Sequence, residues 1–135
     1  MNQPAILIVE DDPMQQRLLC MLAERAAVSF HVASSGLQAL EAVDRWPHYQ
    51  MILMDWRMSE MDGLECTKRI RMREAAHGRR IPIVALTANA MEGDRETCLK
   101  AGMDDYLSKP FTMEQFIQTI HAWLHKTKEA SPERT

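Results

Sequence analysis

The chain has 135 residues, 46% of them hydrophobic and 26% charged, so we expect a single globular domain with a buried core. Its 16 lysines and arginines against 19 aspartates and glutamates give a net charge of −3, which is too mild to indicate nucleic acid or an anionic membrane as a partner. It has no apolar run long enough to cross a membrane and no signal peptide at its start. Its three cysteines lack a C-x-x-C pair, which predicts free thiols in a reducing, cytoplasmic setting.

Apolar segments alternate with amphipathic segments along the chain. Segments 6–9, 51–54 and 83–86 are continuously apolar, which is typical of strands covered by helices on both faces. Segments 29–32 and 105–108 are weaker and indicate edge strands. In chain order the predicted elements are a strand over 6–9, a helix over 13–26, a strand over 29–32, a helix over 35–46, a strand over 51–54, a helix over 64–74, a strand over 83–86, a helix over 88–100, a strand over 105–108 and a helix over 112–126.

This alternation of strands and helices predicts an α/β fold of the (βα)5 type. Right-handed crossovers place helices on both faces of a parallel sheet, and putting the two weak strands at its edges gives the flavodoxin-like, doubly wound order 2-1-3-4-5. We expect the domain to cover 1–126 and 127–135 to be a solvated tail or a linker. The helix over 88–100 has the thinnest apolar stripe and should be the least firmly docked.

Polar residues follow four of the strands and converge, in this topology, at the carboxyl edge of the sheet. They are Glu10-Asp11-Asp12 after the first strand, Asp55 at the end of the third, Thr87-Ala88 after the fourth and Lys109-Pro110 after the fifth. Crowded carboxylates repel one another and favour a bound cation, and oxygen ligands of this kind suit Mg²⁺. A lysine and a hydroxyl beside that ion would hold a phosphoryl group, and a carboxylate could then act as nucleophile and become an aspartyl-phosphate.

Four motifs carry a resemblance to a known family. They are Ile-Leu-Ile-Val-Glu-Asp-Asp-Pro at 6–13, Met-Asp-Trp-Arg-Met-Ser-Glu-Met-Asp-Gly at 54–63, Ile-Val-Ala-Leu-Thr-Ala-Asn-Ala at 83–90 and Gly-Met-Asp-Asp-Tyr-Leu-Ser-Lys-Pro-Phe at 102–111. With these motifs in this order, the sequence resembles a response-regulator receiver domain of two-component signalling over about 5–126. The stretch 85–91 resembles receivers that are fused to histidine kinases.

The resemblance implies which residues hold the metal ion and accept the phosphoryl group. Asp55 is expected to be the phosphoacceptor. Asp11 and Asp12 would be the acid pair that holds Mg²⁺, together with Asp55 and the backbone carbonyl of Arg57. The sequence departs from the family pattern at Ser59, where a proline is common, and this departure predicts a looser loop without loss of a catalytic group.

The resemblance also implies which residues contact and sense the phosphoryl group. Lys109, the hydroxyl of Thr87 and the backbone amide of Ala88 would bind its oxygens. Tyr106 would be the aromatic switch whose rotamer follows Thr87. The Lys109–Pro110 peptide bond would be cis, which would fix the direction of the lysine.

The function implied is that of a signalling switch. The domain would take a phosphoryl group from a partner phosphohistidine and shift the face formed by 88–100, 105–108 and 112–126, through which a homodimer could also form. The partner would be a sensor histidine kinase or a histidine-phosphotransfer protein, docking near Met14 and Leu18. By itself the domain would be no enzyme beyond its own phosphorylation and dephosphorylation. It could be a free-standing regulator or the receiver of a hybrid histidine kinase, in which case the parent chain would be a kinase.

Other interpretations stay open at this point. A Mg²⁺-dependent phosphatase with an aspartate nucleophile has a similar inventory, but haloacid-dehalogenase-like enzymes carry Asp-x-Asp after the first strand, and no cap domain is present. A pseudo-receiver that binds partners without phosphorylation is the third candidate. Asp12 before Pro13 also suits a helix cap. The one basic cluster is interpreted as a solvated helix face rather than a nucleic-acid site, and it comprises Lys68, Arg69, Arg71, Arg73, Arg79 and Arg80.

Overall fold

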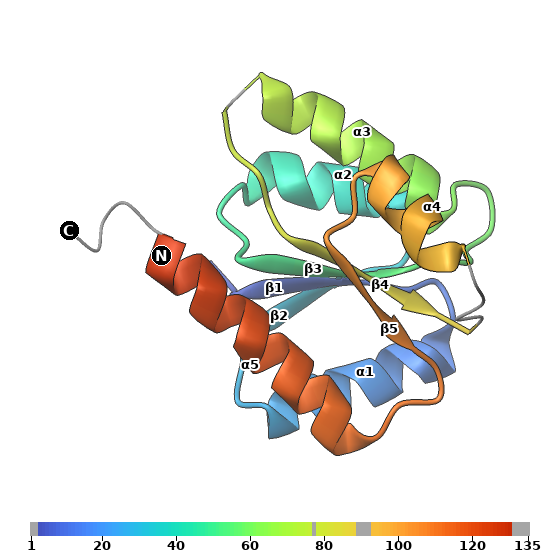
Figure 1. Ribbon diagram of the computed structural model, residues 1–135, viewed down its shortest axis with the longest axis vertical. Helices are drawn as coiled ribbons and strands as arrows, with labels where there is room; N and C mark the ends of the chain where they lie inside the picture. Colours follow the sequence, from blue (N-terminus) through green and yellow to red (C-terminus); the bar gives the residue numbers. More distant parts are fainter. Residues whose placement is uncertain (1–2, 77, 89–92, 131–135) are drawn as a thin grey trace.

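Strands and helices alternate through the whole domain (Figure 1). The computed structural model describes residues 3–76, 78–88 and 93–130, without the side chains of 127–130. The elements in these residues are β1 (Ile6–Val9), α1 (Pro13–Arg25), β2 (Phe30–Ala33), α2 (Gly36–Arg45), β3 (Met51–Asp55), α3 (Gly63–Ala75), β4 (Ile83–Thr87), α4 (Asp94–Ala101), β5 (Asp105–Ser108) and α5 (Met113–Ala130).

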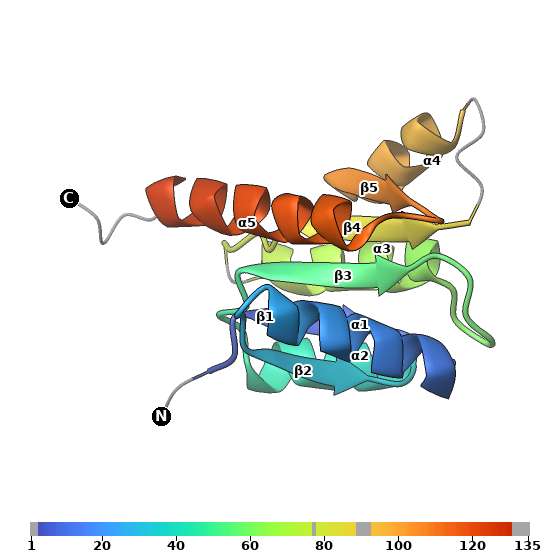
Figure 2. The same ribbon diagram turned by 90° about the horizontal axis from the view of Figure 1, so that it is seen from below.

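The five strands form one sheet in the order β2-β1-β3-β4-β5, and every neighbouring pair is parallel. The predicted fold class and strand order are therefore confirmed. The arrowheads of the strands all point to the same side in Figure 2, so the carboxyl ends of all strands meet at one edge. This edge brings together residues that lie up to about a hundred positions apart in the sequence.

Helices cover both faces of the sheet, with α1 and α5 on one face and α2, α3 and α4 on the other (Figure 1). Because side chains alternate along a strand, Ile6 and Ile8 of β1 enter the core under α1 and α5, while Leu7 and Val9 enter the core under α2 and α3. All residues of β1, β3 and β4 are buried, whereas β2 and β5 are mostly half-buried, as expected for edge strands.

The last two helices differ in extent from the sequence prediction. The helix expected over 88–100 is present as α4 over Asp94–Ala101, while 89–92 lie outside the described residues. Within α4, Cys98 is buried and Leu99 is 46% exposed, in agreement with a thin apolar stripe. Helix α5 continues through Ala130, beyond the expected boundary at 126. None of the helices in the described part of the chain is both long and apolar enough to cross a membrane.

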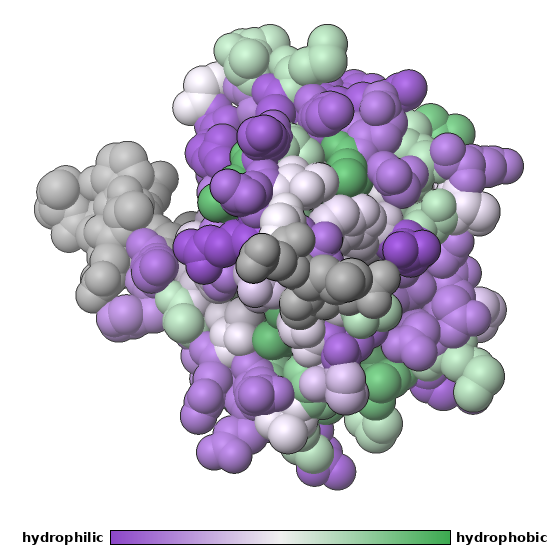
Figure 3. Space-filling model, turned by 45° about the vertical axis from the view of Figure 1, so that its right-hand side comes forward, coloured by the Kyte–Doolittle hydropathy of each residue, from purple (hydrophilic) through white to green (hydrophobic). Residues whose placement is uncertain are grey.

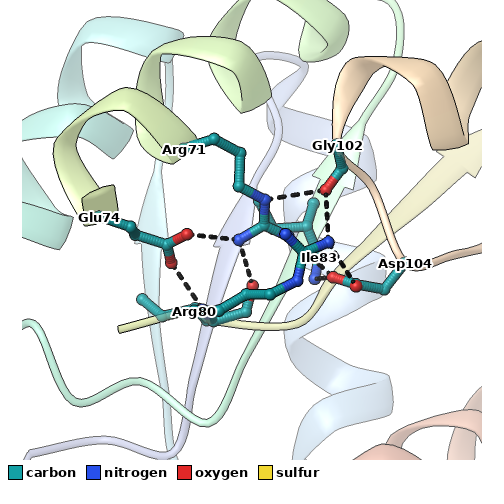
Figure 4. A network of polar contacts seen from close by, with 7 residues as sticks. Arg71, Glu74, Arg80, Ile83, Gly102 and Asp104 are labelled. Atoms are coloured by element: carbon teal, nitrogen blue, oxygen red, sulfur yellow. Dashed lines mark hydrogen bonds and ion pairs between the residues drawn. The ribbon is translucent and has the colours of Figure 1, made fainter. Parts of the chain in front are cut away.

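An ion-pair network centred on Arg71 joins α3 to the segment between α4 and β5 (Figure 4). The Arg71 guanidinium pairs with Glu74 at 2.6 Å and with Asp104 at 2.8 Å, and it donates to the carbonyl oxygens of Gly102 and Ile81, both at 2.8 Å. Its side chain is only 14% exposed. The interpretation of the basic cluster as a solvated face is thus wrong for Arg71, because its donors are taken up by groups that pack over it.

Candidate functional site

Three carboxylates gather where β1 and β3 end. Asp55 is the last residue of β3 and is 6% exposed, and Glu10 follows β1 and is 1% exposed. Glu10, Asp11 and Asp55 each place a carboxylate oxygen within 4.8 Å of those of the other two. They line a hollow of about 210 Å³ to which Lys109 and Ala88 also contribute. The convergence expected from the topology is present.

The two buried acids, Glu10 and Asp55, ionise less readily than exposed carboxyl groups in the absence of a cation. Burial raises the pKa of Glu10 from 4.5 to about 7, and the charge of Asp55 adds to this effect. Burial also raises the pKa of Asp55, although the ammonium group of Lys109 opposes that rise. Glu10 Oε2 accepts a hydrogen bond from the Asp12 amide at 3.1 Å, but Glu10 Oε1 is buried without a partner among the described groups. An unsatisfied buried carboxylate oxygen beside two more carboxylates fits a hard divalent cation.

Lys109 supplies the positive charge that faces this cluster. Its Nζ lies 3.6 Å from Asp55 Oδ1, and its side chain is 25% exposed. The backbone N–H of Lys109 donates to the carbonyl oxygen of Thr87 at 2.7 Å, which ties the loop after β5 to the end of β4. The Lys109–Pro110 peptide bond is cis. Lys109, which follows β5, and Asp55, which ends β3, are therefore held close together by the two strands that flank β4.

The other expected contacts of a phosphoryl group lie at the end of β4, next to the same hollow. Thr87 is the last residue of β4 and is buried, and Ala88 follows it on the exposed rim. Arg57 is exposed at the rim, and its backbone N–H donates to the Asp55 carboxylate, which lowers the pKa of Asp55. Tyr106 in β5 is half-buried against the core, in register with Ala85 of β4.

Asp12 lines the same hollow but is not one of the three clustered acids. Its Oδ2 accepts a hydrogen bond from the Gln15 amide at 2.9 Å, so its carboxylate caps α1. The acid that joins Asp11 and Asp55 is Glu10 instead. The sequence places Glu10 at this edge, but no role was expected for it. Pro13 was the available signal, because a proline in the first turn of a helix makes the residue before it the capping residue.

The loop from β3 to α3 closes tightly on Asp55. The Gly63 amide donates to the carbonyl oxygen of Trp56 at 2.9 Å. A Cβ atom on Gly63 would lie 2.4 Å from the carbonyl oxygen of Asp55, so glycine is required where α3 begins. The Asp62 side chain caps α3 by accepting from the Glu65 amide at 2.9 Å. The start of α3 thus holds the backbone of Asp55 in place.

Comparisons with known proteins agree with this arrangement. A family model described as the response regulator receiver domain matches residues 6–121. The chain is 38% identical over 121 residues to the sensor histidine kinase GacS of Pseudomonas protegens, with 89% of this chain and 13% of that protein covered. It is also 38% identical over 120 residues to the polar-differentiation response regulator DivK of Brucella ovis, with 89% of this chain and 95% of that protein covered.

A solved structure resembles the chain in both sequence and fold. It is the receiver domain of the sensor histidine kinase PA1611 from Pseudomonas aeruginosa PAO1, which has a magnesium ion coordinated in its active-site cleft. The identity is 40% and the TM-score is 0.80, with 92% of this chain and 99% of that chain covered. The chain therefore spans almost all of DivK and of this receiver structure, but only about an eighth of GacS.

Proposed function

This chain belongs to the response regulator receiver family of two-component signalling, and from that premise we propose that Asp55 is its phosphoacceptor. Phosphoryl transfer onto an aspartate is the general function of the family, and its members work with histidine kinases or phosphotransfer partners. The observation that carries the choice of Asp55 is its position at the end of β3, 6% exposed, with Lys109 Nζ at 3.6 Å from Oδ1.

The proposed reaction transfers a phosphoryl group from a phosphohistidine of the partner. An oxygen of the Asp55 carboxylate attacks the phosphorus in line while the phosphorus–nitrogen bond breaks, and the electron pair of that bond stays on the imidazole nitrogen. Lys109 neutralises charge that develops on the phosphoryl oxygens, and the Ala88 amide and Thr87 hydroxyl donate to them. The location of Asp55, Lys109 and Ala88 around one hollow, with Thr87 directly before Ala88 at the end of β4, supports these roles.

We propose Mg²⁺ as the cofactor, held by Asp11, Asp55 and the backbone carbonyl of Arg57. Glu10 replaces Asp12 as the second member of the acid pair, directly or through a water molecule. When bound, the ion would supply positive charge next to the acceptor carboxylate and the incoming phosphoryl oxygens. The proposal is supported by the clustering of three carboxylates, by the unpartnered Oε1 of Glu10 and by the magnesium ion in the related receiver domain.

The switch would act through the face formed by α4, β5 and α5. Thr87 moving toward the phosphoryl group would leave space for the ring of Tyr106 to rotate, and the docking of α4 would change. The small buried surface of α4 supports this proposal, since a weakly docked helix shifts at little cost in free energy. Hydrogen exchange over 93–108 should change on phosphorylation, and unchanged exchange would refute this route. The same face is the one through which we expect any homodimer.

We propose that the phosphodonor docks on α1. Met14, Leu18 and Met21 lie on one side of this helix at a spacing of one turn, and they are 79%, 41% and 48% exposed. Figure 3 shows hydrophobic side chains reaching the surface over this part of the molecule. Charged residues at Met14 and Leu18 should slow transfer from a phosphohistidine protein and leave labelling by a small phosphodonor intact. Equal loss of both would exclude this docking site.

The parent protein of this domain is either a free-standing regulator like DivK or a hybrid histidine kinase like GacS, and relatives of both kinds match the chain. We place the domain in the cytoplasm, which is supported by Cys20, Cys66 and Cys98 all being free thiols. The domain is a regulator, and we propose that its only reactions are its own phosphorylation and dephosphorylation.

One labelling experiment tests the proposed function. The protein is incubated with Mg²⁺ and a small acyl phosphate, and its intact mass is measured for the wild type and for Asp55→Asn. One added phosphoryl group that requires Asp55 is expected. Continuous hydrolysis of phosphate esters would instead indicate a phosphatase, and no adduct would indicate a pseudo-receiver.

A matched pair of variants tests the revised acid pair. Asp11→Asn should abolish Mg²⁺-dependent labelling, because it removes a carboxylate from the cluster. Asp12→Asn should leave labelling near the wild-type rate, because asparagine caps a helix as well as aspartate does. Loss of labelling in Asp12→Asn with an intact fold would restore Asp12 to the metal site.

A further inference from the structure

The loop between β3 and α3 is fastened to the loop between β1 and α1 at a single residue, Ser59. Both the backbone N–H and the hydroxyl of Ser59 donate to Asp11 Oδ2, at 2.9 and 3.1 Å. The two residues lie 48 positions apart in the sequence. From the sequence, a serine here in place of proline predicts a looser loop. The structure shows the opposite, because both donors of Ser59 are used to hold the loop against Asp11.

The backbone around Ser59 is itself held in an unusual conformation. The Met61 amide donates to the carbonyl oxygen of Ser59 at 2.8 Å, which closes a three-residue turn around Glu60. Glu60 has a φ of 70°, in the left-handed region that a residue with a side chain rarely adopts. The N–H of Ser59 is not used within this turn and donates to Asp11. A strained turn persists only where its surroundings stabilise it, and the bonds to Asp11 provide such stabilisation.

The contact matters because Asp11 is the least enclosed of the three clustered carboxylates. Glu10 and Asp55 are buried, whereas Asp11 is half-buried and forms the wall between the hollow at Asp55 and a second hollow of about 540 Å³ lined by Trp56, Met58 and Ser59. Repulsion from the other two carboxylates would drive Asp11 outward into this space. The two Ser59 donors fix Oδ2 at the boundary of the two hollows and so limit that movement, while no hydrogen bond of Ser59 goes to Oδ1.

We propose that Ser59 is a positioning residue that holds Asp11 ready to bind the divalent cation. This inference rests on the proposed function, which assigns Asp11 to the metal site. Both donors of Ser59 bond to Asp11, so Ser59 would act through the Asp11 carboxylate. Groups that orient a metal ligand in this way change metal affinity by roughly tenfold to a hundredfold when they are removed.

Graded substitutions at Ser59 separate its two donors. Ser59→Ala removes the hydroxyl and keeps the N–H, Ser59→Pro removes both, and Ser59→Thr keeps both. Ser29→Ala is the matched control, because Ser29 Oγ accepts from the Ala5 amide at the opposite end of the sheet. Binding of Mg²⁺ to each protein is measured by calorimetry and by intrinsic tryptophan fluorescence, to which Trp56, a residue that lines both hollows, contributes. Urea unfolding without Mg²⁺ verifies that each variant is folded.

We expect the dissociation constant for Mg²⁺ to rise roughly threefold in Ser59→Ala and about tenfold or more in Ser59→Pro, the solvent exposure of the contact keeping the first effect small. Ser59→Thr and Ser29→Ala should bind as the wild type does. The proposal would be overturned if Ser59→Ala bound Mg²⁺ as tightly as the wild type or more tightly. It would also be overturned if the wild-type protein bound no Mg²⁺. If Ser59→Pro does not fold, the result for Ser59→Ala decides. Acyl phosphate labelling of Asp55 is measured separately. A protein that binds Mg²⁺ but is not labelled would refute the proposed function. The Mg²⁺ titration would still decide the role of Ser59.

Discussion

Replacing Glu10 with glutamine should raise the free energy of unfolding of the metal-free protein and weaken its binding of Mg²⁺. Glu10 is 1% exposed, lies beside two other carboxylates, and has one oxygen without a partner among the described groups. Glutamine has nearly the same shape. Its carbonyl oxygen can still accept from the Asp12 amide, and its NH₂ group can donate to the Asp55 carboxylate. The substitution therefore removes a charge and keeps the hydrogen bonds.

The magnitude follows from the pKa of Glu10, which burial raises from 4.5 to about 7. One pKa unit corresponds to about 1.4 kcal/mol, so ionising Glu10 costs on the order of 3 kcal/mol of folding free energy well above pH 7. An acid with a raised pKa binds its proton more tightly in the folded state, so stability is highest below pH 4.5 and falls as the pH rises through 7. Glu10→Gln should gain about 1–3 kcal/mol near pH 8 and nothing near pH 4.5.

Urea unfolding followed by tryptophan fluorescence measures this gain at several pH values in the presence of a chelator. The same titrations with Mg²⁺ should reverse the order of stability, because the wild type gains more binding free energy than Glu10→Gln. Glu41→Gln, at an exposed position of α2, is the control and should change stability by less than about 0.5 kcal/mol. A Glu10→Gln protein that is less stable than the wild type near pH 8 without Mg²⁺ would refute the reasoning, and so would a gain that does not depend on pH.

Other substitutions test the structure around the site. Arg71→Ala should lower the free energy of unfolding by about 2–4 kcal/mol in urea titrations, because it removes the ion pair of Glu74 and one of the two ion pairs of Asp104, both acids of low exposure. Arg69→Ala breaks an exposed pair and should cost less than about 1 kcal/mol. Equal effects would mean that the Arg71 network does not hold α3 to the α4–β5 segment. Gly63→Ala should displace Asp55 and reduce acyl phosphate labelling, since its Cβ would lie 2.4 Å from the Asp55 carbonyl oxygen. Gly78→Ala, which meets no neighbour but has a φ of 68°, should lose about 1–2 kcal/mol of stability and keep its labelling.

Most of the fold could be predicted because the composition of each strand indicates how deeply the strand is buried. The continuously apolar segments became the fully buried β1, β3 and β4, and the two weaker segments became the edge strands β2 and β5. The ends of α4 and α5 were less accurate, because the start of α4 carries little apolar signal and α5 extends into a polar stretch that a tail would also contain. Burial of Arg71 could not be predicted, since it depends on Asp104 and Gly102, which only the folded chain brings near.

The site shows where a motif identifies the chemistry but not the residue. Three consecutive acids, Glu10, Asp11 and Asp12, offer two overlapping pairs, and the motif alone permits either pair to face Asp55. The structure favours the pair Glu10 and Asp11 because of the helix that follows. Pro13 begins α1, so the carboxylate of Asp12 accepts a hydrogen bond from an amide of the first turn. A carboxylate that caps a helix lies outside the group of oxygens within 4.8 Å that Glu10, Asp11 and Asp55 form. The capping rule thus favours Glu10 and Asp11 as the acids of the proposed metal site, because Asp12 already has a hydrogen-bond partner in α1.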